Sequence, residues 1–520
     1  MTVDGVYMHK IDRRMTVSAI ALGLSLALGI SPAIAQDAMP TPVDETGAEI
    51  IVTAQKRDER LIDVPVPVTA VSSDTLITQN LVSIRDYYSR VPGLQIAGER
   101  SSQISLRGIT TGGQTNPTVA ILVDDVPFGS STYLGNATFP DFDPATLDHV
   151  EVLRGPQGTL YGASSLGGLI KYVTKSPDTR EFSGRVEIGA NTVDHGGEGF
   201  SARGSVNVPI ISDHVGLSVS GFHRRDPAWI DNVVGATRTT DTNRRTSWGG
   251  RVSLLVKPID NLTITLSAMK QRQDTSGSNR VAVASATDFT VVDGVSSSTT
   301  FGRPIGDYTN ATKIDTGKSD FELFSAKTQL DLGFGELTSL SAWGRSERTD
   351  LTDQSSTFGF LGLVYPGYQS AVIDDTSNLT KFSQEVRLTG TGAVLDWLIG
   401  GFYTKEHADL PQTILLTSTS KTDDPIYVSA NPSSFRELAA FGDLTIHLTS
   451  RFDIQIGGRY SDNKQVSTAV STIDTPAQLF FGPNSTTTTR SDGQAFTWLV
   501  TPTYHITPCP SSEHSAQLAA

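Results

Sequence analysis

Beyond residue 181 the chain alternates apolar and polar residues with the two-residue period of a β-strand. In residues 451–461, Phe452 and every second residue after it are apolar or glycine, and most of the residues between them are polar. Residues 261–270 repeat the pattern from Leu262 onward. Because successive side chains of a strand point to opposite faces, each run has one apolar and one polar face. A soluble β-sandwich can share this pattern with a membrane β-barrel. The lengths of the connections between strands are therefore needed to distinguish the two folds.

The connections between these strands alternate between short turns and long polar loops. Short turns occur at residues 210–213, 257–260, 333–335, 390–393 and 448–450, and long loops at residues 225–246, 273–318, 348–378, 407–433 and 462–493. Short turns at one rim and long loops at the other are typical of an outer-membrane barrel, whose turns face the periplasm. The pattern therefore favours a transmembrane antiparallel β-barrel over residues 179–508 rather than a soluble sandwich or a solenoid.

The N-terminus has the features of an export signal. Lys10, Arg13 and Arg14 precede an apolar run over residues 17–30, and Ala33 and Ala35 offer the small residues that a signal peptidase reads. The run is shorter than the roughly 20 apolar residues that a membrane anchor needs. We therefore expect residues 1–35 to be a signal peptide and the mature protein to reside in the outer membrane of a Gram-negative bacterium.

Two further segments separate the signal from the barrel. Residues 36–48 are rich in Pro, Asp, Glu and Thr, which indicates a flexible chain, and we expect order to begin near Glu49. Residues 36–62 are accordingly assigned to a periplasmic tether. Residues 63–178 mix short β-rich runs with a helical stretch around residues 72–89 and several Gly-rich turns, which predicts a compact α+β domain.

Composition argues against nucleic-acid binding and against enzymatic chemistry. A formal net charge of −14 leaves no basic face for nucleic acid or anionic lipid. Cys509 is the only cysteine, which excludes an internal disulfide framework and a cysteine-built zinc site. The histidines are scattered, and residues 155–162 lack the Gly-Lys-Ser/Thr ending of a phosphate loop. Asp124 and Asp125 are interpreted as turn residues. We therefore expect that the protein is not an enzyme and that it binds neither a cofactor nor a metal ion.

Three segments before the barrel resemble the TonB-dependent outer-membrane receptors. Residues 49–57 (EIIVTAQKR) resemble the start of such a receptor, with the TonB box at Ile50, Ile51, Val52, Thr53 and Ala54. Residues 106–109 (LRGI) and 119–127 (VAILVDDVP) resemble the middle of its plug domain, and residues 147–162 (LDHVEVLRGPQGTLYG) are its most specific motif. Farther on, residues 382–388, 397–403 and 456–460 resemble its barrel strands.

The resemblance implies an α+β plug domain inside a transmembrane antiparallel β-barrel. Such barrels have about 22 strands, and about 12 can be counted here. It also implies TonB-dependent uptake of a scarce nutrient, for which a ferric siderophore is the typical cargo, with TonB and outer-membrane lipid as partners. Residues 50–54 follow a flexible tether and favour β-structure, so they can pair with a strand of TonB, although they could also form a simple plug strand. The alternative function is a surface binding or adhesion protein, or an inactive truncated barrel fragment.

The same alternation predicts how the plug is seated. In residues 381–388 the apolar side chains share one face, which puts Glu385 in the lumen, and Glu437 lies in the lumen by the same count. Relatives hold the plug through arginines in the two plug motifs. We therefore expect Arg107 and Arg154 to pair with Glu385 and Glu437, with simple solvation of the two glutamates as the alternative.

The end of the chain departs from this pattern. Residues 509–520 show no apolar alternation, contain the single cysteine and lack the terminal aromatic strand that family members have. We expect a receptor cut or frame-shifted near Pro508, followed by an aberrant tail. Because the edges of an open sheet would expose unpaired N–H and C=O groups to lipid, such a product should fail to insert unless a second chain supplies the remaining strands.

Overall fold

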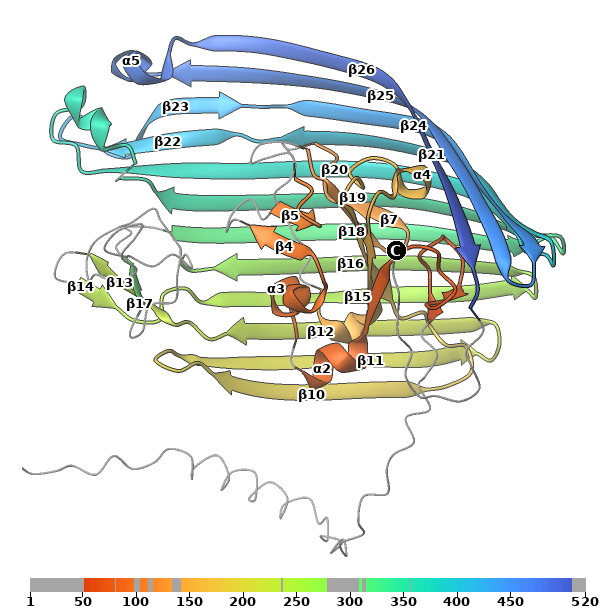
Figure 1. Cartoon of the computed structure of the whole chain (residues 1–520). Coiled ribbons are helices and arrows are strands. Elements are labelled where there is room, and N and C mark those ends of the chain that lie inside the picture. Colours follow the sequence, from red (N-terminus) through yellow and green to blue (C-terminus); the bar gives the residue numbers. More distant parts are fainter. Residues whose placement is uncertain are drawn as a thin grey trace, which may run out of the picture. The chain divides into compact units, whose positions relative to one another are not determined.

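The computed structural model describes residues 51–79, 81–97, 103–110, 116–132, 142–234, 237–277, 308–310, 315–355 and 357–506. The predicted signal peptide, residues 36–50 and the tail at 509–520 lie outside the described residues. All described residues belong to one compact unit that begins at Ile50. Within it, residues 51–178 form a small domain and residues 183–506 a large sheet with its connections (Figure 1).

The small domain is built around a five-stranded sheet with the strand order β3-β8-β9-β6-β7. Its strands are β3 (Val68–Ser72), β6 (Val119–Val123), β7 (Val126–Phe128), β8 (Leu147–Arg154) and β9 (Gly168–Thr174). Two hairpins, β1 (Ile51–Val52) with β2 (Glu59–Arg60) and β4 (Leu94–Ala97) with β5 (Gln103–Leu106), accompany the helices α2 (Ser73–Thr78), α3 (Ile84–Tyr87), η1 (Tyr88–Arg90), η3 (Pro144–Thr146) and α4 (Gly158–Tyr161). The α+β domain is therefore found where the sequence predicts it.

The predicted turn at Asp124 and Asp125 is present between β6 and β7. Asp124 adopts a positive φ of 54°, and its carboxylate accepts a hydrogen bond from the backbone N–H of Thr174 at 2.9 Å. Asp is one of the few residue types that tolerate this conformation, since its short side chain can bond to nearby backbone. The turn sends β7 back antiparallel to β6 and makes β7 an edge of the small sheet.

Twelve strands of the large sheet form an antiparallel series in which each pairs with its neighbours along the chain. They are β10 (Ser183–Thr192), β11 (Glu198–Ile211), β12 (Val215–Asp226), β15 (Arg245–Ile259), β16 (Leu262–Thr275), β18 (Asp315–Asp331), β19 (Glu336–Asp353), β20 (Ser370–Gly390), β21 (Leu395–Asp409), β24 (Ser433–Thr449), β25 (Phe452–Ile473) and β26 (Ser485–Tyr504). This agrees with the expected count of about 12. Among the described residues, β10 and β26 each pair with one strand only.

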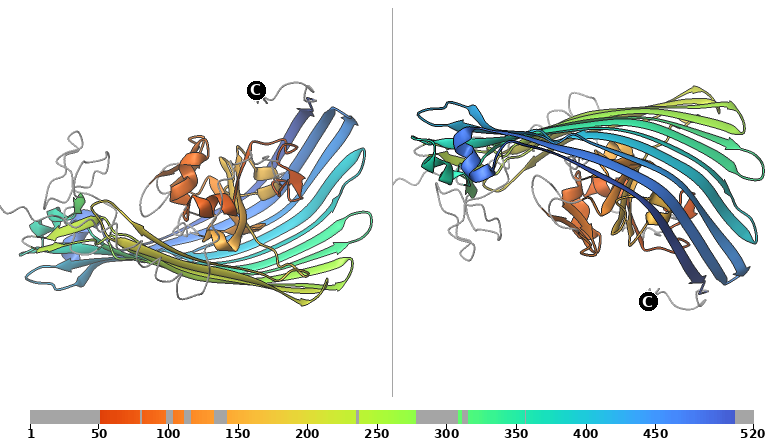
Figure 2. Two further views of the ribbon diagram at one scale, coloured as in Figure 1. Left: turned by 90° about the horizontal axis from the view of Figure 1, so that it is seen from below. Right: turned by 90° about the horizontal axis from the view of Figure 1, so that it is seen from above.

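The large sheet curves around the small domain, which lies on its concave side (Figure 2). Side chains on β20 and β24 follow the predicted alternation: Glu385 and Glu437 are buried on the concave face, whereas Phe382, Val386 and Leu438 are 41–57% exposed on the convex face. The predicted apolar outer face and polar inner face are thereby confirmed. No helix in the described part of the chain is long and apolar enough to cross a membrane.

The strands extend farther into the predicted long loops than the sequence indicates. β25, for example, has 22 residues and ends at Ile473, inside the predicted loop at 462–493. A tilted strand needs only about 9–11 residues to cross a bilayer, so the surplus lies beyond it on the long-loop side. There a hairpin of β22 (Gln412–Thr417) and β23 (Asp424–Ala430) joins η4 (Gly359–Leu363) and η5 (Thr475–Ala477) in a separate apolar cluster.

The core of the small domain continues into the wall of the large sheet. Val126 and Tyr172 belong to the same buried cluster as Phe321 and Leu323 of β18. The rings of Phe128 and Phe321 meet edge to face, with centroids 5.2 Å apart. This apolar patch is one of the contacts that hold β7 against the wall.

Candidate functional site

The N-terminal segment, residues 51–62, is packed onto the small domain. β1 pairs with β2, and Val52 and Ala54 are buried against Leu153 and Leu169 of the small sheet. The predicted tether therefore ends earlier than residue 62. The physical reason is that burial stabilises an apolar, β-favouring run when it can pack against an apolar surface, here that of the small sheet.

Thr53 is the most heavily bonded residue of this segment. Its N–H and its hydroxyl donate to Glu151 Oε1 at 2.7 and 3.0 Å, and its carbonyl accepts from Lys171 Nζ at 3.2 Å. The Tyr161 hydroxyl donates to the carbonyl of Ala54 at 2.8 Å. Glu151 and Tyr161 belong to the LDHVEVLRGPQGTLYG motif, so the most specific motif in the sequence is the part of the domain that holds the predicted TonB box.

Glu151 is itself supported by His149. His149 Nε2 lies 2.8 Å from Glu151 Oε1, and His149 Nδ1 lies 2.7 Å from Asp148 Oδ2. Burial alone would lower the pKa of His149, but its hydrogen bonds to the two carboxylates outweigh burial and raise that pKa to about 9. At neutral pH the imidazole is therefore charged, and it keeps Glu151 ionised as an acceptor for Thr53.

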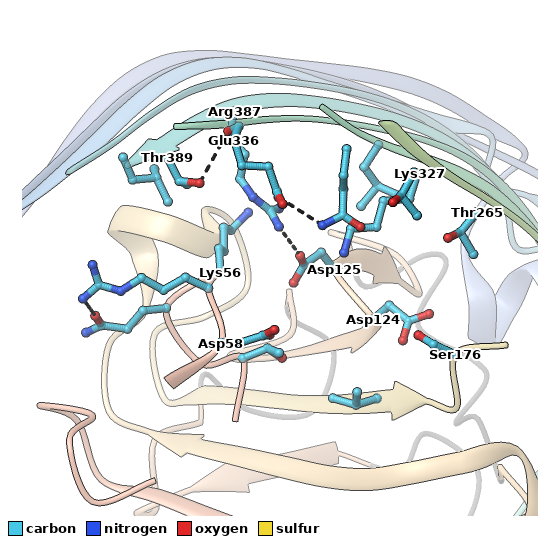
Figure 3. Close-up of a pocket in the computed structure, with 18 of the residues that line it drawn as sticks. Lys56, Asp58, Asp124, Asp125, Ser176, Thr265, Lys327, Glu336, Arg387 and Thr389 are labelled. Carbon is cyan, nitrogen blue, oxygen red and sulfur yellow. Dashed lines mark hydrogen bonds and ion pairs between the residues drawn. The ribbon is translucent and has the colours of Figure 1, made fainter. Parts of the chain in front are cut away.

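A second set of contacts joins the N-terminal segment to the large sheet. Lys56 Nζ lies 2.5 Å from Glu385 Oε2, and Arg387 on the same strand donates to the other oxygen of Glu385 at 2.8 Å. Arg387 also bonds Asp125 Oδ2 at 2.8 Å, and Lys171 Nζ lies 2.6 Å from Asp125 Oδ1. We call these five buried residues the ionic network. Figure 3 labels three of them, Lys56, Asp125 and Arg387.

The charges of the network stabilise one another against the cost of burial. Burial would raise the pKa of Asp125, but the charges of Lys171 and Arg387 outweigh it and hold that pKa well below its usual value. Burial lowers the pKa of Lys56, with Glu385 opposing the shift. The pairing of Lys56 with Glu385 is thus what makes a charged ammonium tolerable at this depth.

The structure corrects the predicted partners of the two glutamates. Both are buried on the inner face as expected, but Glu385 pairs with Lys56 and Arg387, and Glu437 pairs with Arg459 of the neighbouring strand at 2.6 Å. Arg107 instead lies in an exposed turn with a positive φ of 54°. Arg154 is half-buried, and its N–H donates to the carbonyl of Pro67. Neither arginine therefore pairs with the predicted glutamate, because Arg107 lies in a turn of the small domain and Arg154 ends β8, where its backbone is bonded within that domain.

Four residues of the network, Lys56, Asp125, Lys171 and Arg387, line a cavity of about 850 Å³ between the small domain and the wall. Its lining is mostly polar and includes Arg251. Asp58, Asp124, Lys327 and Glu336, which also line it, are labelled in Figure 3. In the part of the chain that the structure describes, no group of histidine, cysteine or acidic side chains could hold a metal ion.

Comparison with known proteins agrees with this architecture. Residues 60–169 match the family model described as TonB-dependent Receptor Plug Domain. The chain is 29% identical over 456 residues to the pesticin receptor of Yersinia pestis, covering 84% of this chain and 59% of that protein. It is 33% identical over 193 residues to a hemin receptor of Yersinia enterocolitica, covering 35% and 28% of the two chains.

The fold is also similar to a solved structure of the same kind. The ferric yersiniabactin uptake receptor of Yersinia pestis superposes with a TM-score of 0.66 at 22% identity, covering 85% of this chain and 62% of that one. The chain thus spans less than two thirds of the length of each of these three relatives.

Proposed function

The chain belongs to the TonB-dependent receptors of the Gram-negative outer membrane, and from this premise we propose that it takes part in energised uptake of a scarce nutrient. The small domain is then the plug and the large sheet the barrel wall. The observation that carries the proposal is the double attachment of the N-terminal segment, through Thr53 to the plug and through Lys56 to the wall. A pull on this segment acts on both at once.

The proposed mechanism follows from the geometry of these attachments. TonB would add a strand to residues 50–54, since main-chain hydrogen bonds between strands can bear a load and need no particular side chains. Val52 is fully buried, so pairing requires the segment to leave the plug first. That departure separates Thr53 from Glu151, and the pull that follows separates Lys56 from Glu385, which unlocks the plug at its contact with the wall.

For the cargo we propose a ferric siderophore. The ferric yersiniabactin uptake receptor supports a ferric cargo by similarity, whereas the hemin receptor supports hemin as the alternative. A wide barrel would leak without a plug, so any such cargo has to wait for the plug to be unlocked.

Uptake by a deletion strain that carries the chain on a plasmid tests the proposal. We expect growth on one member of a panel of ferric chelates, hemin and vitamin B12, and loss of that growth with a protonophore. Val52→Pro, which removes a backbone N–H from the strand, should abolish uptake and leave cargo binding intact. Val52→Ala keeps the N–H and serves as the matched control. Cargo binding without energy-dependent uptake would instead indicate a surface binding protein.

A further inference from the structure

Three basic residues lie next to one another on the convex face of the large sheet. Lys405 of β21 is the cross-strand partner of Arg436 of β24, and Arg436 is also the partner of Lys464 of β25. On its other side Lys405 is in register with Phe382 of β20, which lies on the convex face. All three basic residues are exposed. We call Lys405, Arg436 and Lys464 the basic row.

The basic row borders an apolar band on the same face. Toward the short turns, the outward residues Ile399, Leu438 and Tyr460 of these strands are 48–61% exposed. Tyr403, the cross-strand partner of Leu438, is the outward residue before Lys405 on β21. In an outer-membrane barrel, aromatic residues mark the two interfaces of the apolar band, and the long loops lie outside the cell. The basic row therefore lies at the level of the lipid headgroups in the outer leaflet.

The basic row is short of acidic partners. Elsewhere on the convex face, basic residues at the long-loop end of the strands pair with carboxylates: Lys270 with Glu322 at 2.5 Å, Lys318 with Asp320 at 3.3 Å and Arg345 with Glu347 at 3.1 Å. Arg436 has only a long contact of 3.8 Å with Asp462. Within the described part of the chain, Lys405 and Lys464 form no ion pair, although Asp492 is the cross-strand partner of Lys464.

This arrangement carries a cost that a bound anion would remove. Like charges that lie directly opposite each other on neighbouring strands are destabilising, and Arg436 has such a neighbour on each side. Two strand spacings bring the three positive charges within about 10 Å of one another. Phosphate groups that span the row would offset the repulsion and accept charge-assisted hydrogen bonds.

We propose that the basic row binds a lipid of the outer leaflet through phosphate groups that lie just above its acyl chains, which is the chemistry of lipid A in lipopolysaccharide. The guanidinium of Arg436 and the two ammonium groups hold the phosphates, and the acyl chains lie against Leu438 and Tyr460. The net charge of −14 disfavours a general attraction to anionic lipid, so binding depends on this local row. The inference rests on the outer-membrane location and does not depend on uptake.

Lipid binding to the purified full chain tests the site. The chain is held in micelles of dodecyl maltoside, which is uncharged, and titrated with bisphosphorylated lipid A while native mass spectrometry counts the bound lipid. We expect a tightly bound lipid A on the wild type. Lys405→Gln/Arg436→Gln/Lys464→Gln should weaken binding about a hundredfold, since each basic residue near an anionic lipid surface contributes about a factor of five. Monophosphorylated lipid A should bind the wild type less tightly.

A matched triple variant controls for general charge attraction. Lys270→Gln/Lys318→Gln/Arg345→Gln removes the same number of positive charges from the same face, but each of these residues is already paired with a carboxylate. Binding should therefore stay within about twofold of wild type, because exposed ion pairs contribute little. An equal loss in both triple variants would mean that any positive charge on this face suffices, which overturns the proposal.

Thermal unfolding in the same micelles separates a ligand site from a structural role. Without lipid A, the variant with the neutralised basic row should unfold no earlier than wild type, because repulsion is removed. Added lipid A should raise the unfolding temperature of wild type and not that of the variant. Earlier unfolding of the variant without lipid A would show a structural role. Equally tight binding of phosphatidylglycerol, or displacement of lipid A by inorganic phosphate, would also refute the assignment.

Discussion

Removing the charge of Glu385 should release the N-terminal segment from the barrel. Glu385→Gln leaves Lys56 without a carboxylate partner, in a site where the lysine side chain is 3% exposed. An unpaired buried charge typically costs about 3–5 kcal/mol. This cost cannot exceed the free energy needed to deprotonate Lys56, because a lysine that loses its proton is no longer a buried charge. With an ordinary pKa of about 10.4, deprotonation at pH 7 costs about 5 kcal/mol, at about 1.4 kcal/mol per unit.

The variant can also avoid this cost by letting the segment detach, so that Lys56 reaches water. A penalty of about 3 kcal/mol then raises the population of the detached state roughly a hundredfold. Hydrogen exchange of peptides covering residues 51–62, measured at neutral pH in outer-membrane vesicles, should accelerate by that factor. Because a neutral lysine tolerates burial, the difference between variant and wild type should shrink as the pH is raised toward 10.

Glu437→Gln is the matched control for this measurement. Glu437 is as buried as Glu385, but its partner Arg459 lies on the barrel wall. The hydrogen-exchange rate of residues 51–62 in Glu437→Gln should therefore stay within about twofold of the wild-type rate. This is far less than the acceleration expected when the buried pair of the segment itself is broken. The reasoning is refuted if Glu385→Gln exchanges no faster than wild type, or if Glu437→Gln accelerates exchange as strongly.

Three further expectations concern the plug. Glu385→Ala should also raise entry of large antibiotics through the outer membrane, measured as a lower inhibitory concentration; unchanged sensitivity would argue against a lock at this position. Gly168→Ala should destabilise the plug by about 2 kcal/mol or more, because Gly168 has a φ of +140° and a Cβ there would lie 2.1 Å from the carbonyl oxygen of Leu153; urea titration of the purified chain checks this. The pKa of His149 is raised to about 9 from its usual 6.5, so the protonated imidazole stabilises the fold fully below about pH 6.5, and this stabilisation is lost as the pH rises through 9. His149→Gln should therefore make the free energy of unfolding depend less on pH. An equally steep pH dependence in the variant would exclude His149 as its source.

Much of the fold follows from local pattern alone. The two-residue alternation and the alternation of short and long connections predict the antiparallel wall, and the same alternation places Glu385 and Glu437 on its inner face, where both are found. Asp124 likewise adopts the predicted turn. These features depend on the geometry of a single strand or turn, which a few neighbouring residues determine.

The partners of the inward-facing charges are decided by the tertiary structure. Lys56 and Glu385 are 329 residues apart, and no period in the sequence relates them. The same is true of Asp125, which sequence reasoning treats as a turn residue although it bonds both Lys171 and Arg387. Local pattern determines which face a side chain occupies. The distant residue opposite it depends on strand register and on how the plug docks in the wall, and both are set by the sum of many weak contacts across the whole molecule.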